Sequence, residues 1–382
     1  MRNDSGSGSP ALVICSKSTW EPTIRREHAL AQLATAHGAE VYFVERPADV
    51  RAAGRRGEAL GWCRGFAARY ARRSVQDGVE VLGASVILPG HRGGLGERSS
   101  AWLLARKLRG IPRLNEAVVV ANLPWQWPAV AAVDARRRVF DCTDDWAEHL
   151  PERAGRLAEL CSRIGREADA ITLDNRAMAD RFRPGRTVLV RNGVSAELLG
   201  PLAERPQEKR MVHTGTLGLR FDADLAGEVL AAASDWRLDL YGQCQYPGRG
   251  ERAGAELEEL LARYPSRVAY HGVVPRAGLA QVIDRGSVAV IFNRPGRAGG
   301  GDSMKLYDYA ARGRPIVSTR FSPNLQVDGP PRLRLADNTA EFVAALEESL
   351  FEPLSWAGER RRWAEDQRWE QRWPTWARTL FG

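Results

Sequence analysis

Short apolar runs alternate with helical patterns along most of the chain, and this alternation limits the folds it can adopt. The run at residues 11–15, Ala-Leu-Val-Ile-Cys, is followed by a helical pattern near residues 24–37 and a second run at 40–44. Apolar runs of this length are typical of parallel strands that are buried on both faces. The same alternation starts again at residue 211. The sequence therefore predicts an α/β protein with two Rossmann-like, doubly wound sheets.

Chain length and one polar segment predict how these elements divide into domains. The chain has 382 residues, enough for two domains that each bury a core. Residues 199–209 have the composition of a linker. We therefore expect an N-terminal domain at 1–198, a linker at 199–209, a second domain at 210–355 and a helical segment at 356–382. Two such domains would face a cleft, which is a common place for ligands.

Composition excludes several classes of protein. Hydrophobic residues make up 44% of the chain and charged residues 27%, as in folded globular proteins. No apolar run approaches the roughly 20 residues needed to cross a bilayer. Residues 1–10 are polar and lack the apolar core of a signal peptide, so we expect a cytoplasmic protein. The five cysteines include no Cys-x-x-Cys, which argues against a disulfide framework or structural zinc.

The formal net charge of +8 makes an anionic partner plausible. Nucleic acid is not expected, because the basic residues are dispersed and no recognisable binding motif is present. The segment from Arg51 to Arg73 is rich in arginine and carries three aromatic residues on one helical stripe. It predicts a peripheral contact with an anionic membrane, and the basic, apolar segment at 102–109 supports this. A stripe that faces the core is the favoured alternative.

A glycine loop enters a capped helix within residues 297–319. Glycines precede Asp302 and Ser303, and an amphipathic helix follows. Amide groups at a helix N-terminus can hold an anion, and Lys305 adds positive charge in the first turn. Only four of the 55 lysines and arginines are lysines, which suggests that a compact charge is needed here. Asp308, one turn later on roughly the same face, suits the hydroxyls of a ribose. An ordinary capped surface helix is the alternative.

Two adjacent carboxylates follow a predicted strand of the first domain. Asp144 and Asp145 come shortly after the run at 138–140, and open α/β sheets place their chemistry at the carboxyl ends of strands. Either aspartate is a candidate general base, and capping of the next helix is the alternative for each. Asp222-Ala223-Asp224 has the form of a metal-binding Asp-x-Asp motif. It stands at a predicted helix start, so we expect Asp222 to be a cap and predict no metal.

Several short motifs occur in a fixed order between residues 187 and 320. They are Arg191-Asn192-Gly193-Val194, Thr214-Gly215 with Arg220, Tyr241-Gly242, His271-Gly272-Val273-Val274-Pro275, Ser303-Met304-Lys305-Leu306-Tyr307-Asp308-Tyr309 and Gly313-Arg314-Pro315-Ile316-Val317. In this order they resemble the donor half of GT-B glycosyltransferases, especially bacterial family 4-like enzymes of cell-envelope and natural-product pathways. Residues 25–28, 44–45 and 141–145 resemble the family more loosely. The C-terminal helix resembles the one that crosses back to the first domain in this fold.

The resemblance implies roles for individual residues. The implied donor-binding set is Gly215, Arg220, Val273, Val274, Gly300, Ser303, Met304, Lys305 and Asp308. Within it, Arg220 and Lys305 would hold the donor diphosphate, and the two valines would meet the nucleotide base. Asp308 would accept the ribose hydroxyls, where the family usually has glutamate. The acceptor-side candidates are Trp20, His28 and Trp125, and for the tryptophans packing in the core is the favoured alternative.

The expected stereochemistry depends on one glycine. Retaining family-4 enzymes often place a glutamate eight residues before the position of Asp308, where this chain has Gly300. The Ser-Met-Lys run and the first-domain carboxylates also resemble inverting GumK-type glucuronosyltransferases, in which a first-domain aspartate is the base. The resemblance therefore slightly favours an inverting, metal-independent enzyme with Asp144 or Asp145 as the base.

The predicted function is a glycosyltransferase of the hexosyltransferase type. It would move a sugar from a nucleotide-diphosphate sugar, most simply a UDP-sugar with no further cofactor, to a small-molecule or lipid-linked saccharide acceptor. The product would be a cell-envelope polysaccharide, a glycolipid or a natural product. A sugar-nucleotide epimerase of the same architecture is an alternative, but it needs carboxylates near the donor sugar, and residues 294–301 contain none. A non-catalytic sugar-nucleotide-binding protein is the other alternative.

Overall fold

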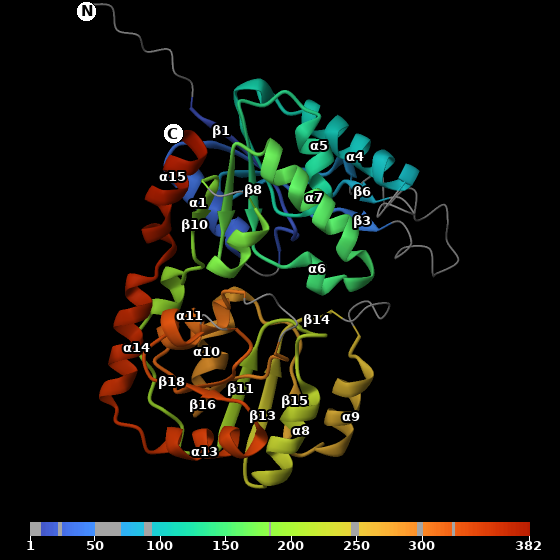
Figure 1. The fold of residues 1–382 in the computed structure, drawn as a ribbon. Coiled ribbons are helices and arrows are strands. Elements are labelled where there is room, and N and C mark those ends of the chain that lie inside the picture. The colour runs from blue at the N-terminus through green and yellow to red at the C-terminus, as the bar shows by residue number, and fades with distance from the viewer. Residues whose placement is uncertain are drawn as a thin grey trace, which may run out of the picture. The chain divides into compact units, whose positions relative to one another are not determined.

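The computed structural model describes residues 9–21, 25–49, 70–87, 94–182, 185–245, 252–295, 301–322 and 325–382. The chain divides into two compact units (Figure 1). Unit 1 consists of Met1–Arg191 together with Arg372–Gly382, and unit 2 consists of Asn192–Gln371. Each unit is built on a largely parallel sheet, which confirms the predicted α/β class.

The sheet of unit 1 has eight strands in the order β10-β9-β8-β7-β1-β2-β5-β4. Every residue of β1 and β7 is buried, as expected of central strands covered on both faces. The bounds are β1 Ala11–Cys15, β2 Glu40–Val44, β4 Arg73–Gln76, β5 Val79–Leu82, β7 Val118–Ala121, β8 Arg137–Cys142, β9 Ala170–Leu173 and β10 Thr187–Leu189. Two short strands, β3 (Ala48–Asp49) and β6 (Val86–Ile87), form a separate parallel pair.

Helices cover this sheet and fill its core. Their bounds are α1 Arg26–Ala36, α4 Gly94–Arg109, α5 Trp127–Ala131, α6 Trp146–His149, α7 Ala154–Glu167 and α15 Trp373–Phe381. Leu108, Trp127 and Ile164 bring α4, α5 and α7 into one core with Val13 and Phe140 of the sheet. α1 packs against α15 and against β1, β2 and β5.

One strand predicted in unit 1 is wrong in its extent. The apolar pattern over residues 79–88 predicts a single strand, but β5 ends at Leu82 and β6 begins separately at Val86. β5 also has an antiparallel partner, β4, that was not predicted. Asp77 and Gly78 join the two strands with φ values of 52° and 76°, so the Asp-Gly pair forms the kind of tight turn that hairpins favour.

The sheet of unit 2 has six strands, all parallel, in the order β15-β13-β11-β16-β17-β18. The bounds are β11 Arg210–Thr214, β13 Arg237–Tyr241, β15 Val268–Tyr270, β16 Val288–Ile291, β17 Ile316–Thr319 and β18 Leu333–Ala336. Another short pair, β12 (Leu217–Gly218) and β14 (Cys244–Gln245), follows β11 and β13 in the chain. The apolar runs of the second half therefore form the expected parallel sheet.

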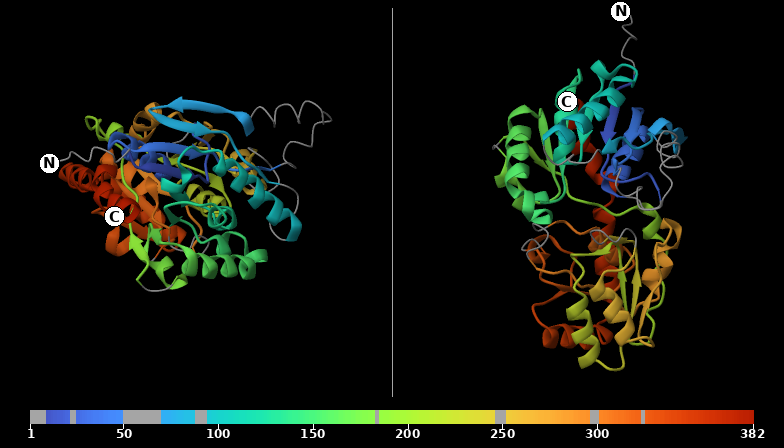
Figure 2. Two further views of the ribbon diagram at one scale, coloured as in Figure 1. Left: turned by 90° about the horizontal axis from the view of Figure 1, so that it is seen from above. Right: turned by 90° about the vertical axis from the view of Figure 1, so that its right-hand side faces the viewer.

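Helices lie on both faces of this second sheet (Figures 1 and 2). The bounds are α8 Ala223–Ala232, α9 Ala255–Arg263, α10 Arg276–Asp284, α11 Met304–Ala311, α12 Leu325–Asp328, α13 Thr339–Leu350 and α14 Ser355–Asp366. One core contains side chains of α8, α9 and α13, and the other contains side chains of α10, α11 and α14. Asp222 caps α8 as predicted, because its carboxylate accepts from Leu225 N at 3.1 Å.

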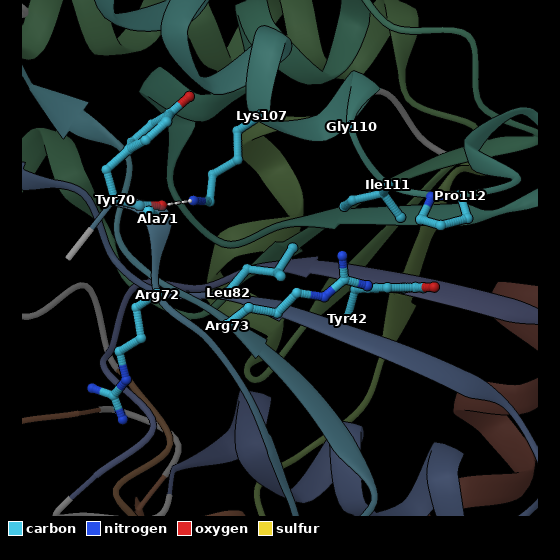
Figure 3. Close-up of a pocket in the computed structure, with 10 residues that line it drawn as sticks. All are labelled: Tyr42, Tyr70, Ala71, Arg72, Arg73, Leu82, Lys107, Gly110, Ile111 and Pro112. Carbon is cyan, nitrogen blue, oxygen red and sulfur yellow. Dashed lines mark hydrogen bonds between the residues drawn. The ribbon is translucent and has the colours of Figure 1, made fainter. Parts of the chain in front are cut away.

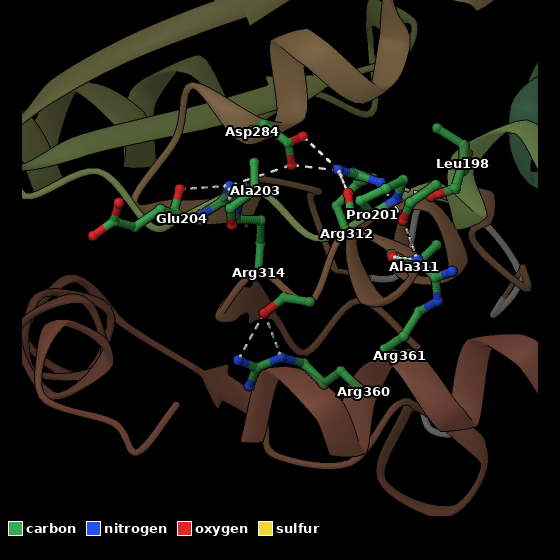
Figure 4. A network of polar contacts seen from close by, with 12 residues as sticks. Leu198, Pro201, Ala203, Glu204, Asp284, Ala311, Arg312, Arg314, Arg360 and Arg361 are labelled. Atoms are coloured by element: carbon green, nitrogen blue, oxygen red, sulfur yellow. Dashed lines mark hydrogen bonds and ion pairs between the residues drawn. The ribbon is translucent and has the colours of Figure 1, made fainter. Parts of the chain in front are cut away.

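The observed division differs from the predicted boundaries at residues 199–209. These residues belong to unit 2, which begins in the sequence at Asn192. Arginine side chains hold the carbonyl groups of this segment (Figure 4). Arg312 donates to the carbonyls of Leu198, Gly200 and Pro201, and Arg314 donates to those of Ala203 and Glu204. A segment with the composition of a linker is therefore fixed in the fold of unit 2.

The C-terminal segment is helical, and it passes from unit 2 into unit 1 at Arg372. α14 packs on α11 within unit 2. α15 packs within unit 1, where Trp373 stacks on His37 at 4.6 Å and the guanidinium of Arg26 lies 5.0 Å from the ring centre of Trp376. The arginine- and tryptophan-rich tail is thus part of two separate cores.

The membrane contact predicted at residues 51–73 lies mostly outside the described residues, because the description resumes only at Tyr70. Among the helices that the structure describes, none is long and apolar enough to cross a bilayer.

Candidate functional site

Three glycines stand at the carboxyl ends of neighbouring strands in unit 2. Gly215 follows β11 with φ of 108°, Gly242 follows β13 with φ of 141°, and Gly272 follows β15 with φ of 73°. Gly215 N donates to the Tyr241 carbonyl at 2.8 Å, and Gly242 N donates to the Gly272 carbonyl at 2.7 Å. A Cβ on Gly242 would lie 1.8 Å from Gly215 O, so only glycine fits this contact.

The side chain of Lys305 lies over the Gly215 turn. A Cβ on Gly215 would be 2.8 Å from Lys305 Cε and 3.3 Å from its Nζ. Lys305 is the second residue of α11, whose N-cap is Ser303, and the Ser303 side chain makes no capping hydrogen bond. The first amide groups of a helix have no acceptor within the helix. The lysine charge and these amide groups therefore meet at one place, which is suited to an anion.

Two tyrosines fix α11 against the rest of unit 2. The Tyr309 hydroxyl accepts from Thr214 N at 2.8 Å, which ties the helix to the end of β11. The Tyr307 hydroxyl donates to Asp302, whose carboxylate also accepts from Asn192 N at 2.7 Å. Asp302 and Ser303 were expected to cap α11. Asp302 instead binds Asn192 and Tyr307, and the Ser303 side chain makes no capping hydrogen bond. Lys305 is held on a rigid helix as a result.

Asp308 is partly buried one turn after Lys305. Burial raises the pKa of its carboxyl group to about 7, and the positive charges of Arg276 and Lys305 oppose this shift. Of the residues described by the structure, none hydrogen-bonds to the Asp308 carboxylate. A carboxylate that has lost water without gaining donors is ready to accept hydroxyl groups of a ligand.

His213 is a buried residue of this site that the sequence analysis did not assign. It is fully buried at the end of β11, and its Nδ1 donates to the Val290 carbonyl at 3.1 Å. Its Nε2 is buried and has no hydrogen-bond partner within the described part of the chain. Burial and the charge of Lys305 lower the imidazole pKa well below its usual value, so His213 is neutral. Its place directly before Thr214-Gly215 was the signal that could have found it.

Of the other predicted donor residues, Arg220, Val273 and Val274 lie on loops that follow strands of unit 2. Arg220 is on the loop between β12 and α8 and is partly exposed. Val273 is 39% exposed and Val274 is partly buried, and both follow Gly272. Met304 is the first residue of α11. Gly300 lies outside the described residues.

In unit 1, Asp144 and Asp145 have different surroundings. Asp145 is 3% exposed, caps α6 through Ala147 N and Glu148 N at 3.1 and 3.4 Å, and pairs with Arg181. Asp144 is 16% exposed and pairs with Lys17 Nζ at 2.7 Å. The Lys17 ammonium also donates to the Thr143 hydroxyl. Asp145 is thus used in the local fold, whereas Asp144 lies beside a lysine at the carboxyl ends of β1 and β8.

The acceptor-side candidates are also divided. Trp20 is 7% exposed and packs edge-on against Phe43 at 5.0 Å. His28 is fully buried, its Nδ1 accepts from Arg25 N at 3.0 Å, and its Nε2 donates to the Thr19 carbonyl at 2.9 Å. Trp20 and His28 therefore contribute to the packing and the internal hydrogen bonds of unit 1. Trp125 is partly exposed and lies edge-on to Trp146 at 4.9 Å.

Unit 1 also contains a cavity of about 120 Å³ that the sequence did not predict (Figure 3). Its lining comprises Tyr42, Tyr70, Ala71, Arg72, Arg73, Leu82, Lys107, Gly110, Ile111 and Pro112. Lys107 Nζ donates to the Tyr70 carbonyl at 2.7 Å and lies 4.3 Å from the Tyr70 ring centre. Burial lowers the pKa of Lys107 to about 8.

Residues 210–351 match the family model described as "Glycosyl transferases group 1". No curated protein sequence matches the chain. Among solved structures, the chain is similar to Anabaena Alr3699/HepE in complex with UDP and glucose, with a TM-score of 0.70 and 14% identity over 97% of this chain and 99% of that one. It is also similar to sucrose-phosphate synthase from Thermosynechococcus elongatus, with a TM-score of 0.69 and 16% identity over 98% and 99%.

A third similar structure is a complex of S. aureus TarM with fondaparinux, α-GlcNAc-glycerol and UDP. The TM-score is 0.58 at 11% identity, and the match covers 74% of this chain but only 59% of the TarM chain. The family match lies within unit 2, where the glycines, Lys305 and Asp308 converge. Residues 210–351 are therefore similar to group 1 glycosyl transferases, and the chain has the GT-B fold of these solved structures.

Proposed function

We propose that the chain transfers a sugar from a nucleotide-diphosphate sugar to a hydroxyl group of an acceptor. The observation that carries this proposal is the position of Lys305, whose ammonium lies over the Gly215 turn at the N-terminus of α11. Asp308 follows on the same helix, and its carboxylate accepts no hydrogen bond from the part of the chain that the structure describes. Lys305 and Asp308 stand one helical turn apart on α11. This spacing suits a nucleotide whose diphosphate contacts Lys305 and whose ribose hydroxyls contact Asp308.

The same arrangement supports transfer as well as binding. When the bond from the sugar C1 to the diphosphate oxygen breaks, negative charge grows on the departing diphosphate. Lys305 and the first amides of α11 are fixed where they would stabilise that charge, and Arg220 is the second cation in our proposal. These groups supply positive charge without a divalent ion, so we propose a metal-independent reaction. Addition of EDTA should leave the rate unchanged.

We propose a UDP-sugar as the donor. HepE and TarM are described in complex with UDP, and they have the fold of this chain. Val273 and Val274 follow Gly272 in a loop that would meet the base by main chain and packing. Because such contacts discriminate weakly between bases, the test must compare several nucleotides.

We propose Asp144 as the general base of an inverting reaction. The acceptor oxygen would bond to C1 as its proton passes to an Asp144 carboxylate oxygen. Lys17 pairs with the Asp144 carboxylate and donates to the Thr143 hydroxyl. Asp145 is already used as the N-cap of α6. Gly300, where retaining relatives often carry glutamate, also supports inversion. The anomeric configuration of the product, measured by NMR, decides between inversion and retention.

The acceptor in this proposal is a saccharide, either free or lipid-linked, in cell-envelope or natural-product synthesis. Trp125 and Trp146 form a partly exposed aromatic pair, and Trp146 directly follows Asp145. Aromatic faces of this kind stack on sugar rings. Trp146 stands two residues after the proposed base, Asp144, and Trp125 contacts Trp146. A cytoplasmic protein that meets the inner face of a membrane remains our prediction for its location.

A thermal-shift panel of UDP-, GDP- and dTDP-sugars tests the donor proposal. A ligand present at about 100 times its Kd stabilises a fold by about 2.7 kcal/mol, so one nucleotide class should raise the melting temperature clearly. Lys305→Met should remove this shift, whereas Lys209→Met, which loses pairs with Asp235 and Glu347 and a contact with the Trp236 ring, should retain it. A flat response of the native chain to every sugar nucleotide would overturn the proposal.

Product analysis then separates the alternatives. Conversion of the bound sugar nucleotide into its epimer without an acceptor would indicate an epimerase. Binding that is never followed by loss of the sugar, with any saccharide acceptor tried, would indicate a non-catalytic binding protein. Release of UDP together with a glycosylated acceptor is the expected result.

A further inference from the structure

The outward side of α4 carries a stripe of five exposed residues. They are Leu95, Arg98, Trp102, Arg106 and Arg109, and their spacing of three and four places them on one helical face. Leu95 is 80% exposed and Trp102 is 55% exposed. The Arg106 guanidinium lies 5.6 Å from the ring centre of Trp102. The stripe therefore combines apolar side chains with positive charge.

The opposite side of α4 is anchored in unit 1. Leu104, Ala105 and Leu108 are buried in its core, and α4 packs beside α5 and β6 (Figure 1). Glu97 is the only acidic residue of the helix, and it is buried and paired with Arg156. The exposed stripe thus contains no carboxylate. Its positive charge is not balanced within the helix.

Positive charge continues past the carboxyl end of the helix. Lys107 and Gly110 line the cavity of Figure 3 together with Arg72 and Arg73. In Figure 3 the Arg72 side chain points away from the centre of the cavity. This lining stands at the carboxyl end of α4, where the stripe ends at Arg109.

Two other exposed apolar residues, Phe351 and Leu354, have different surroundings. Phe351 and Leu354 in unit 2 are 84% and 80% exposed. The same turn carries Glu348, whose side chain is 71% exposed. Glu348 pairs with Arg334 at 3.6 Å, so the positive charge near these two residues is balanced by a carboxylate. Phe351 and Leu354 therefore provide a control for exposure without unbalanced positive charge.

We infer that the Leu95–Arg98–Trp102–Arg106–Arg109 face of α4 binds the surface of an anionic phospholipid bilayer. Leu95 and Trp102 would enter the boundary between headgroups and acyl chains, and the three arginines would contact lipid phosphates. Leucine and tryptophan favour a bilayer over a nucleic acid, because a phosphate backbone offers no apolar phase. This inference concerns a surface outside the donor site and does not depend on sugar transfer.

Co-sedimentation of the full chain with vesicles tests the inference. Vesicles of phosphatidylcholine mixed with phosphatidylglycerol should pellet the native chain, and vesicles of phosphatidylcholine alone should pellet far less. Each arginine near such a surface contributes about fivefold to partitioning, so Arg98→Gln, Arg106→Gln and Arg109→Gln combined should lower it by about a hundredfold. Leu95→Ser and Trp102→Ser should each lower it by about tenfold.

Matched variants keep this test interpretable. Phe351→Ser and Leu354→Ser remove equally exposed apolar groups and should leave partitioning unchanged. Every variant should keep its melting temperature, since the stripe contributes nothing to the core. The UDP-induced thermal shift should also persist in each variant, so loss of lipid binding and failure of the donor proposal remain distinguishable.

A second measurement locates the contact. Lipids brominated in the acyl chain should quench part of the tryptophan fluorescence in the native chain, and Trp102→Phe should remove that quenching while vesicle binding persists. Equal binding to neutral and anionic vesicles, or unchanged binding after the three arginine substitutions, would overturn the inference. So would displacement from vesicles by duplex DNA at equimolar phosphate, because the partner would then be a nucleic acid.

Discussion

Asp308 links donor binding to the stability of unit 2. Burial raises its pKa from 3.8 to about 7 in the folded chain. Between these pH values the folded chain binds more protons at this group than the unfolded chain, so Asp308 lowers the free energy of unfolding as pH rises. We expect Asp308→Asn to gain stability over the native chain between about pH 4 and pH 8, with roughly 4 kcal/mol as the upper limit.

Urea unfolding at several pH values measures this difference. Asp337→Asn is the control, because the Asp337 side chain is 54% exposed and pairs with Arg320 at the surface. The same Asp308→Asn protein should bind UDP more weakly, since an amide cannot accept two ribose hydroxyls as a carboxylate does. Stability curves of Asp308→Asn and native chain that run parallel across this pH range would contradict the assigned pKa.

Asp144 and Asp145 allow a residue-scale test of the proposed base. Asp144→Asn should lower the transfer rate by about 10²- to 10⁴-fold with little change in UDP binding. Asp145→Asn should instead lower the free energy of unfolding by about 0.5–2 kcal/mol, because Asp145 caps α6 and pairs with Arg181. Steady-state kinetics and urea unfolding separate the two effects. Full transfer by Asp144→Asn would remove it as the base.

The sequence predicted the positions in this site that depend on local structure. Lys305 and Asp308 could be recognised because a glycine loop, a cap and a helix lie next to one another in the chain. Lys17 could not, because its role depends on a contact with Asp144 beyond another strand. His213 could be noticed from its place before Gly215, but its contact with Val290 could not be predicted. Single residues do not show which side chains meet in space.

At the scale of elements, α11 is positioned by the Tyr309 hydroxyl. Tyr309 is fully buried, and its hydroxyl contacts both Thr214 N and Thr214 Oγ1, at 2.8 and 3.2 Å. Tyr309→Phe leaves the buried Thr214 amide without this acceptor, which should cost about 1–3 kcal/mol of unfolding free energy. Because the amide precedes Gly215, UDP affinity should fall too.

Tyr264→Phe is the matched control for this element. The Tyr264 hydroxyl donates to the Gly227 carbonyl at 3.0 Å, on α8 and away from the glycine turns. Tyr264→Phe should lose stability and keep its UDP affinity in isothermal titration calorimetry. If both variants keep their affinity, Tyr309 stabilises the fold without positioning the donor site.

Regular elements were predictable where an apolar run or a helical period extends over several residues. β1 and β2 have the predicted bounds. Two-residue strands such as β12 and β14 carry no period of their own. They exist because Leu217 and Cys244 follow strands that already lie side by side. Tertiary position, and not local preference, creates such elements.

At the scale of the whole molecule, the division into units depends on arginine contacts that composition conceals. Residues 199–209 have a polar, proline-containing sequence, yet Arg312, Arg314 and Arg361 bind their carbonyl groups. Asp284 pairs with Arg312 and Arg314 on the other side (Figure 4). From the sequence alone, an exposed linker of this composition cannot be distinguished from a segment that arginine side chains hold in the fold.

Arg312→Met should therefore destabilise unit 2 specifically. The Arg312 side chain is 4% exposed, and its loss leaves Asp284 and the carbonyls of Leu198 and Pro201 without their main donor. Breaking such a buried pair costs about 3–5 kcal/mol. Hydrogen exchange followed by mass spectrometry should show faster exchange in peptides of residues 192–371, whereas peptides of residues 94–182 keep their protection. Arg320→Met, at a surface pair with Asp337, should change neither set. Equal loss of protection in both units would mean that they unfold together and that this network does not belong to one unit alone.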